Sequence, residues 1–245
     1  MRRAGFILAV AAALLLVTGL SSLGGVLRGA DDQDDGNERL YLPDGKFLRV
    51  ASLGFHAPAA DYAWLQAVQY YGGYRRGEHD LRYFDGLVDA VTTMDPRFED
   101  AYVFSALIHC LDDADFTGAV DVLKRGLLHN PDSWRLHFEI GFIHYVFTGE
   151  YAVASRWFDQ AAAQPGASDF CRRFAAWSAG RAGDTLGSLY LWENLRRNTQ
   201  NDDMRALATG MVEKLEAALS GEPLPGEVGP PSPQTSSRVN PGVSQ

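Results

Sequence analysis

A pattern of small and large side chains recurs three times along this 245-residue chain, at spacings of 35 and 34 residues. Each copy has a turn residue and an acidic residue, followed by a small, a large and a final small or aliphatic side chain. The turn residues are Ala114, Gly149 and Gly183, and the later positions hold Ala119, Ala154 and Ser188, then Leu123, Phe158 and Trp192, then Gly126, Ala161 and Leu195. Repeats of this length are typical of stacked architectures, because one unit cannot bury its apolar face alone.

The order of small, large and small side chains has a physical meaning on a helix. In the copy that runs from Gly149 to Pro165, Ala154, Phe158 and Ala161 lie on one side of a helix. The alanines let a neighbouring helix approach closely, while the aromatic ring fills the space beside them. The pattern therefore predicts helices that pack in pairs and copies that stack on one another.

This signature resembles the tetratricopeptide repeat, in which a Leu-Gly pair on the first helix precedes Ala-x3-Phe and a proline on the second. The residues that occupy these places are Ile140-Gly141, Phe174-Ala175 and Ser105-Ala106 for the pair, and Pro96, Pro131 and Pro165 for the proline. The resemblance covers residues 60–197. It implies an all-α fold, an α-solenoid of antiparallel helix pairs that curves around a concave face.

The repeat array is assigned to residues 57–220. Its first copy is irregular, with helices expected in 61–77 and 81–96. An amphipathic helix over 202–219 is expected to close the array. The apolar stripe of that helix is predicted from residues four apart, namely Leu207, Met211, Leu215 and Leu219.

Two segments flank the array. Residues 31–56 are assigned as a linker and an N-terminal cap, in which 46–55 is predicted as a short capping helix, with a strand as the alternative. Residues 221–245 are rich in Pro, Gly and Ser and are expected to form a disordered tail.

The first 30 residues predict a signal anchor or a signal peptide. Arg2 and Arg3 precede an uncharged run over residues 4–27, which as a helix would span about 36 Å, enough for a hydrocarbon layer of about 30 Å. The most apolar part of the run, residues 4–17, also has the size of a signal-peptide core. We expect a retained single-pass anchor helix, and cleavage stays open as the alternative.

Charge sets the expected orientation and excludes one class of partner. Arginines before the apolar run favour a cytoplasmic N-terminus, so the array is expected on the periplasmic side of an inner membrane, or soluble in the periplasm or secreted after cleavage. All 31 acidic residues and 19 of the 22 basic residues follow residue 30, which gives that part a net charge of -12. A nucleic-acid-binding protein needs a basic excess against phosphates, so we expect no nucleic acid as partner.

The polar residues do not form a recognisable chemical motif. His137 and His144 share a helix face but occupy packing positions of the repeat, and no further metal ligands are evident. Asp115 is expected to cap the following helix rather than to belong to a calcium loop. Cys110 and Cys171 lie two copies apart, roughly 16 to 20 Å, which is too far for a disulfide. We therefore expect no metal, no cofactor and no catalysis.

The resemblance implies that a protein or peptide partner binds the inner face of the first helices, where such repeats receive peptides. The residues at positions of that type, besides Leu107, are Asp100, Val103, Arg135, Phe138, Phe142, Tyr145, Arg172 and Arg173. Aromatic and arginine side chains are frequent anchors of protein interfaces. For Phe138 and Phe142, packing against the neighbouring helix is the alternative interpretation.

These features predict a membrane-anchored, bacterial-type protein of the tetratricopeptide-repeat kind that acts as a non-catalytic protein-protein interaction scaffold. We expect it to help assemble a membrane-associated complex on the extracytoplasmic face. The alternative is a binding module for a polysaccharide or lipid ligand in envelope biogenesis. A glycan site would expose rows of aromatic side chains without charge, which distinguishes the two hypotheses.

Overall fold

The computed structural model describes residues 48–49 and 52–220, and this part of the chain is all-α, without a strand. Its elements are α3 (His56–Arg75), α4 (Phe84–Met94), α5 (Glu99–Ile108), the π-helical turn η1 (His109–Asp113), α6 (Phe116–Leu127), α7 (Trp134–Ile143), the π-helical turn η2 (His144–Thr148), α8 (Tyr151–Ala162), α9 (Asp169–Arg181), α10 (Thr185–Asn198) and α11 (Asp202–Leu219). The all-α prediction is confirmed. None of these described helices has the length and apolar character needed to cross a membrane. The predicted anchor or signal (1–30), most of the linker and the tail (221–245) lie outside the described residues.

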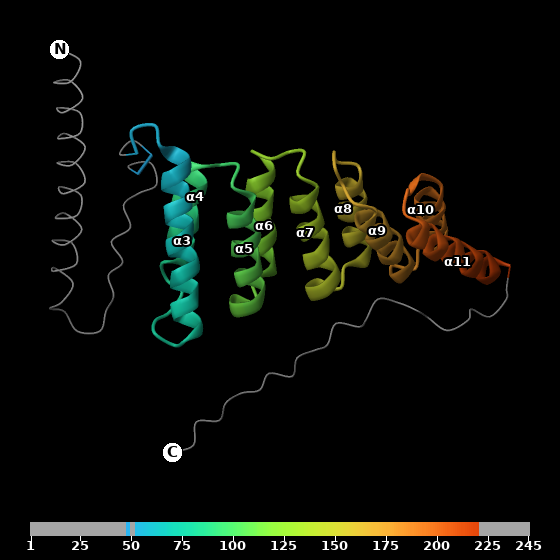
Figure 1. Cartoon of the computed structure of the whole chain (residues 1–245). Helices are drawn as coiled ribbons and strands as arrows, with labels where there is room; N and C mark the ends of the chain where they lie inside the picture. The colour runs from blue at the N-terminus through green and yellow to red at the C-terminus, as the bar shows by residue number, and fades with distance from the viewer. Residues whose placement is uncertain (1–47, 50–51, 221–245) are drawn as a thin grey trace, which may run out of the picture.

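Successive helices pack against one another in chain order, from α3 at one end of the row to α11 at the other (Figure 1). We call α3, α5, α7 and α9 the first helices, and α4, α6, α8 and α10 the second helices. Each first helix packs against the second helix that follows it, and α11 packs against α10. The result is an elongated row of helix pairs closed by a single helix.

The small and large residues of the repeat interlock as predicted. Phe158 on α8 is completely buried, and its ring lies so close to Gly141 on α7 that a Cβ built there would be 2.8 Å away. Gly126 on α6 lies in a similar way against Tyr102 on α5, where a Cβ built on the glycine would be 2.9 Å from the tyrosine ring. Ala154, one turn before Phe158, is also fully buried. The close approach within these pairs therefore depends on residues that have little or no side chain.

Left-handed residues connect the helices within three of the pairs. They are Ala114, Gly149 and Gly183, with φ angles of 53°, 72° and 83°. After the first of them, the Asp115 carboxylate accepts a hydrogen bond from the Gly118 amide at 2.9 Å, so the predicted cap of α6 is confirmed. Asp184 caps α10 in the same way through the Gly187 amide, at 2.8 Å. The reverse turn thus recurs in all three copies, whereas the aspartate cap is present before α6 and α10 and Glu150 forms no side-chain cap before α8.

Two first helices end in a π-helical turn that the sequence did not reveal. These turns, η1 and η2, begin with His109 and His144. The amides of Asp115 and Glu150 donate to the carbonyls of these histidines, both at 2.9 Å, and close the wider turn. A hydrophobic period of 3.6 does not distinguish one π turn from an α turn, so no sequence signal marked them.

The closing helix α11 is confirmed over Asp202–Leu219, but its buried stripe is only partly as predicted. Ala208 and Val212 are buried in the cluster that contains Trp192, whereas Leu207 and Leu219 are 37% and 48% exposed. Four residues advance about 40° beyond one full turn, so a stripe at that spacing drifts away from a single face. The short side chain of Ala208 also lets α11 approach the large ring of Trp192.

The N-terminal cap is described only in part. Residues 48 and 49 are helical, in agreement with the predicted capping helix, and Leu48 packs against the core of the first pair. The Arg49 guanidinium donates to the carbonyl of Thr93 at 2.9 Å. These contacts place the cap residues against the end of α4.

Candidate protein-binding face

The first helices form a continuous layer, because side chains link each of them to the next. Between α3 and α5, the ring of Phe104 lies 5.3 Å from the rings of both Trp64 and Tyr71. Between α5 and α7, Asp100 Oδ1 lies 2.5 Å from Arg135 Nη1. Both residues of this ion pair were predicted as partner-binding positions, and the structure brings them together across two copies of the repeat.

Between α7 and α9 the link is a cluster of aromatic rings. The Phe138 ring lies 4.7 Å from that of Phe170 and 5.5 Å from that of Phe174. The Tyr145 hydroxyl accepts a hydrogen bond from Arg181 Nη1 at 3.3 Å. Phe138 and Tyr145 are only 7% and 5% exposed. The expectation that they present their rings to a partner is wrong, because packing with α9 covers them; for Phe138 the alternative interpretation is confirmed.

Asp100, Val103, Arg135 and Phe142 are among the predicted positions that keep accessible surface. Asp100 and Arg135 have 58% and 41% of their side chains exposed. Val103 is half-buried at the edge of the core cluster around α5 and α6. Phe142 is half-buried as well, with its ring 6.2 Å from that of Phe138 one turn earlier.

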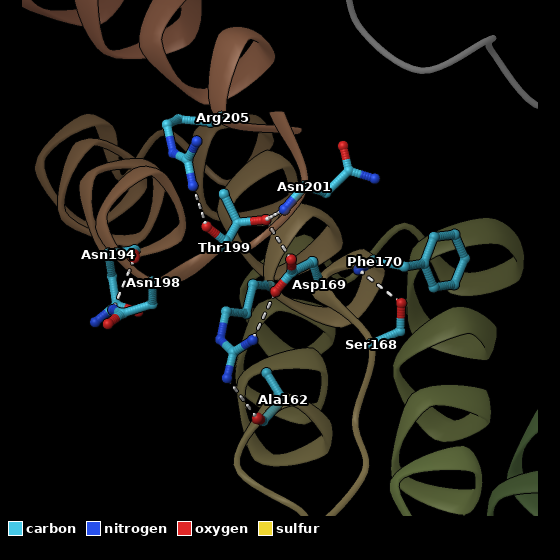
Figure 2. Close-up of polar contacts among 10 residues, drawn as sticks. Ala162, Ser168, Asp169, Phe170, Asn194, Asn198, Thr199, Asn201 and Arg205 are labelled. Atoms are coloured by element: carbon cyan, nitrogen blue, oxygen red, sulfur yellow. Dashed lines mark hydrogen bonds and ion pairs between the residues drawn. The ribbon is translucent and has the colours of Figure 1, made fainter. Parts of the chain in front are cut away.

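Arg172 is engaged within the protein instead of facing a partner. Its guanidinium donates to Asp169 Oδ1 at 2.8 Å and to the Ala162 carbonyl at 3.4 Å. Asp169 also accepts a hydrogen bond from the hydroxyl of buried Thr199, whose carbonyl accepts one from Arg205 at 2.7 Å (Figure 2). This network joins α9 to the ends of α8 and α10 and to α11. These contacts place Arg172 at the junction with the closing helix, and 33% of its side chain stays exposed.

Arg173 is half-buried among aromatic rings. Its Cζ lies 5.3 Å from the ring centroid of Phe170, 5.8 Å from that of Phe174 and 4.8 Å from that of Trp177. The Nε atom is buried without a hydrogen-bond partner, and this burial lowers the pKa of the guanidinium. Stacking on aromatic faces offsets part of the desolvation cost, but a guanidinium has five N–H donors to satisfy.

Glu139 on α7 is a second half-buried charge of the layer, and the repeat register did not indicate it. The side chain is half-buried, and burial raises the pKa of its carboxyl group, while the nearby charge of Arg135 lowers it. Within the described part of the chain Glu139 makes no hydrogen bond or ion pair. The available signal was an acidic residue inside the otherwise apolar run from Phe138 to Phe142.

The layer exposes aliphatic side chains on α3, α5 and η1. Leu65 and Val68 on α3 are 50% and 39% exposed, and Leu107 and Leu111 are 46% and 59% exposed. Single exposed leucines are ordinary on protein surfaces. Here they come in two pairs, each with its members three or four residues apart, on two successive first helices. Of the four, the repeat register indicated only Leu107.

The acidic turn after α5 has a structural role. Asp112 in η1 accepts hydrogen bonds from the hydroxyls of Tyr71 and Tyr74, at 3.0 and 3.4 Å, and from Arg75 Nη1 at 3.3 Å. Burial and the Asp112 carboxylate raise the pKa of both tyrosines. These contacts tie the end of the first helix of the second copy to α3.

The histidines pair with protein groups, as the packing interpretation expects. His137 Nδ1 lies 2.8 Å from a backbone carbonyl at the start of α7, and His144 Nδ1 lies 2.8 Å from Glu150 Oε2. Across residues 48–49 and 52–220, no three His, Cys, Asp or Glu side chains gather as metal ligands. Cys110 and Cys171 are buried and free, and burial raises the pKa of each thiol to about 11.

The sequence matches no protein-family profile, and no curated protein is similar to it in sequence. The functional interpretation therefore rests on the geometry of the first-helix layer. That layer combines exposed aliphatic side chains, a cross-copy ion pair and two half-buried charges.

Proposed function

We propose that this chain is an α-solenoid similar to tetratricopeptide repeats, preceded by a hydrophobic anchor helix. The packing of helices in chain order and the recurrent small and large residues at the helix contacts support the repeat assignment. The anchor over residues 4–27 rests on its length and apolar composition. The arginines before it support an inner-membrane location with the array in the periplasm, or a soluble periplasmic protein after cleavage.

We infer further that the protein is a non-catalytic scaffold that binds a protein partner on the first-helix layer and helps to assemble a membrane-associated complex. The observation that carries this inference is the exposure of Leu107 and Leu111, one turn apart, together with that of Leu65 and Val68 on the preceding first helix. Covering a leucine fully is worth about 1.5–3 kcal/mol. A partner that meets a preformed helix layer also avoids the cost of ordering that layer.

The chemistry of this layer favours a protein over a polysaccharide. Four of its five exposed large hydrophobic side chains, namely Leu65, Val68, Leu107 and Leu111, are aliphatic, and the fifth is Tyr62 on α3. The exposed aromatic side chains Phe55, Tyr62 and Tyr190 are spread over the turn before α3, α3 itself and α10. They do not form the row of aromatic rings that the glycan hypothesis requires.

Cross-linking of the full-length protein in intact native membranes tests the proposed face. The variant Leu107→Asp/Leu111→Asp is compared with Leu186→Asp/Tyr190→Asp. The second pair has the same four-residue spacing on the second helix α10, and its side chains are even more exposed, at 68% and 69%. We expect the wild type and the α10 variant to capture the same protein. The yield of that protein should fall at least about tenfold with Leu107→Asp/Leu111→Asp, since the partner would then cover two charges in place of two leucines.

Equal capture by both variants would show that the face is wrongly assigned. A wild-type protein that captures no other protein in its native membrane would contradict the scaffold function itself. Thermal unfolding of both variants serves as the control, because exposed substitutions of this kind leave the free energy of unfolding nearly unchanged.

A further inference from the structure

Glu139 and Arg173 occupy equivalent positions on neighbouring first helices. Each lies ten residues before the left-handed residue in the turn to the next second helix, which is Gly149 for Glu139 and Gly183 for Arg173. Because α7 and α9 belong to successive copies with the same pattern, the two side chains lie on corresponding sides of their helices. The two positions carry opposite charges.

Two other pairs of charged residues in the layer are already compensated. Asp100 pairs with Arg135, and Arg172 pairs with Asp169. Glu139 and Arg173 make no hydrogen bond or ion pair with any residue in the described ranges. The chain after residue 30 has twelve more acidic than basic groups. In such an acidic protein, an arginine without a carboxylate partner is unexpected.

Half-buried charges that make no direct hydrogen bond or ion pair are unfavourable, because they lose water and gain little in return. For Glu139, the nearby charge of Arg135 offsets only part of the effect of burial. The rings of Phe170, Phe174 and Trp177 stabilise the Arg173 cation but accept no conventional hydrogen bond from its buried Nε. Glu139 lacks even such a contact. A ligand group of opposite charge would therefore contribute more binding free energy at these two positions than at charges that are already paired within the protein.

We propose that the partner of the first-helix layer is an extended protein segment that places a carboxylate on Arg173 and a lysine or arginine on Glu139. This inference rests on the proposed function and adds the charge pattern of the partner. Glu139 and Arg173 lie on neighbouring first helices, and an extended chain advances about 3.3 Å per residue. The two charges of the partner are therefore several residues apart.

The neighbouring surface sets the character of the rest of the segment. Beyond Glu139, the next first helix is α5, with the exposed side chains of Leu107 and Leu111. In the partner segment, apolar residues therefore follow the basic residue in the direction away from the acidic residue. A free anion or an anionic lipid headgroup would satisfy Arg173 but not Glu139, so the requirement for both charges separates a peptide from those ligands.

Selection of a random linear peptide library against the full-length protein in detergent micelles tests this inference. We expect enriched peptides with a basic and an acidic residue at a constant spacing of several positions. Their Kd rises about 10- to 100-fold in Glu139→Gln and in Arg173→Gln, since each change removes one charged hydrogen-bond partner. The exchanged variant Glu139→Arg/Arg173→Glu prefers the same peptide with its two charges exchanged.

The control variant is Arg156→Gln/Asp159→Asn, which removes two exposed charges from the second helix α8 and leaves the Kd unchanged. Equal unfolding midpoints of all variants show that the glutamine variants fold. Enriched peptides that lack the charge pair, or that bind both glutamine variants as tightly as the wild type, overturn the inference. If such peptides still fail to bind Leu107→Asp/Leu111→Asp, the charge pattern is wrong while the proposed face stands.

Discussion

The hydroxyl of Tyr71 on α3 donates a hydrogen bond to the carboxylate of Asp112 in η1, with the two oxygens 3.0 Å apart. The Asp112 side chain is only 6% exposed, and it also receives hydrogen bonds from Tyr74 and Arg75. A residue from the π turn of one copy is thus held by the first helix of the copy before it. This relationship shows how irregular helix ends, as well as regular packing, connect the copies.

Replacement of Asp112 by Ala is expected to lower the free energy of unfolding by about 1–3 kcal/mol, because buried hydroxyl donors lose their acceptor. Urea denaturation followed by circular dichroism measures the change. Asp113→Ala is the matched control, since that side chain is 51% exposed and should change stability by less than about 0.5 kcal/mol. Similar losses in both variants would contradict a role for the contact with α3.

The close approach of α7 and α8 at Gly141 predicts a penalty for one added methyl group. Gly141→Ala should destabilise the protein by about 1–3 kcal/mol, because its Cβ would lie 2.8 Å from the buried Phe158 ring. Gly210→Ala on α11 introduces the same group into open space and should stabilise the helix by about 0.5–1 kcal/mol. Calorimetric unfolding of both variants checks the opposite signs, and a stabilising Gly141→Ala would refute the interlocked packing.

Tyr145 provides a test of the correction to the predicted site. Because its ring is buried, Tyr145→Ala should lower the free energy of unfolding by about 3–5 kcal/mol. Tyr145→Phe removes only the hydroxyl that contacts Arg181 and should cost about 1 kcal/mol or less. Denaturant titration separates the two. A Tyr145→Ala variant as stable as the wild type would return this residue to the set of partner-binding candidates.

The two buried thiols predict a loss of stability in alkali. The pKa of Cys110 and of Cys171 rises from the usual 9.0 to about 11 on burial, so the folded protein holds these protons longer than the unfolded chain. The stabilisation is complete below about pH 9 and is lost as pH rises toward 11, with a slope of up to about 1.4 kcal/mol per pH unit for each thiol.

Unfolding measured from pH 8 to 11 checks this slope against the variant Cys110→Ala/Cys171→Ala. The variant should be less stable at pH 8, because two small cavities replace buried sulfur atoms, but its decline with pH should be shallower. Parallel declines in the two proteins would mean that the thiols ionise alike in the folded and unfolded chains.

Much of the helical framework could be predicted from the sequence. The spacing of Ala154, Phe158 and Ala161, and its recurrence in neighbouring copies, indicated both the helices and their packing surfaces. Capping by Asp115 followed from local chemistry that needs no knowledge of the rest of the fold. Such features depend on a few residues close together in the chain.

The fine structure of the candidate site could not be predicted in the same way. Repeat register indicated that Phe138 and Tyr145 lie on the first-helix face, but not that aromatic residues about 30 positions later cover them. Similarly, Arg172 is held by Asp169, which in turn depends on Thr199 at the junction with α11. Burial and charge pairing at these positions depend on the identity of the side chains in the next copy, which the period of the repeat does not specify.

The claim that the first-helix layer binds a protein is tested most directly by a photo-reactive amino acid in place of Leu107 or, separately, of Leu186. Both sites are exposed leucines, but Leu107 lies on a first helix and Leu186 on a second helix. After irradiation of native membranes, the account predicts one discrete protein adduct from the Leu107 site and none from the Leu186 site. Adducts of the same size and yield from both sites, or an adduct from the Leu186 site alone, would contradict it.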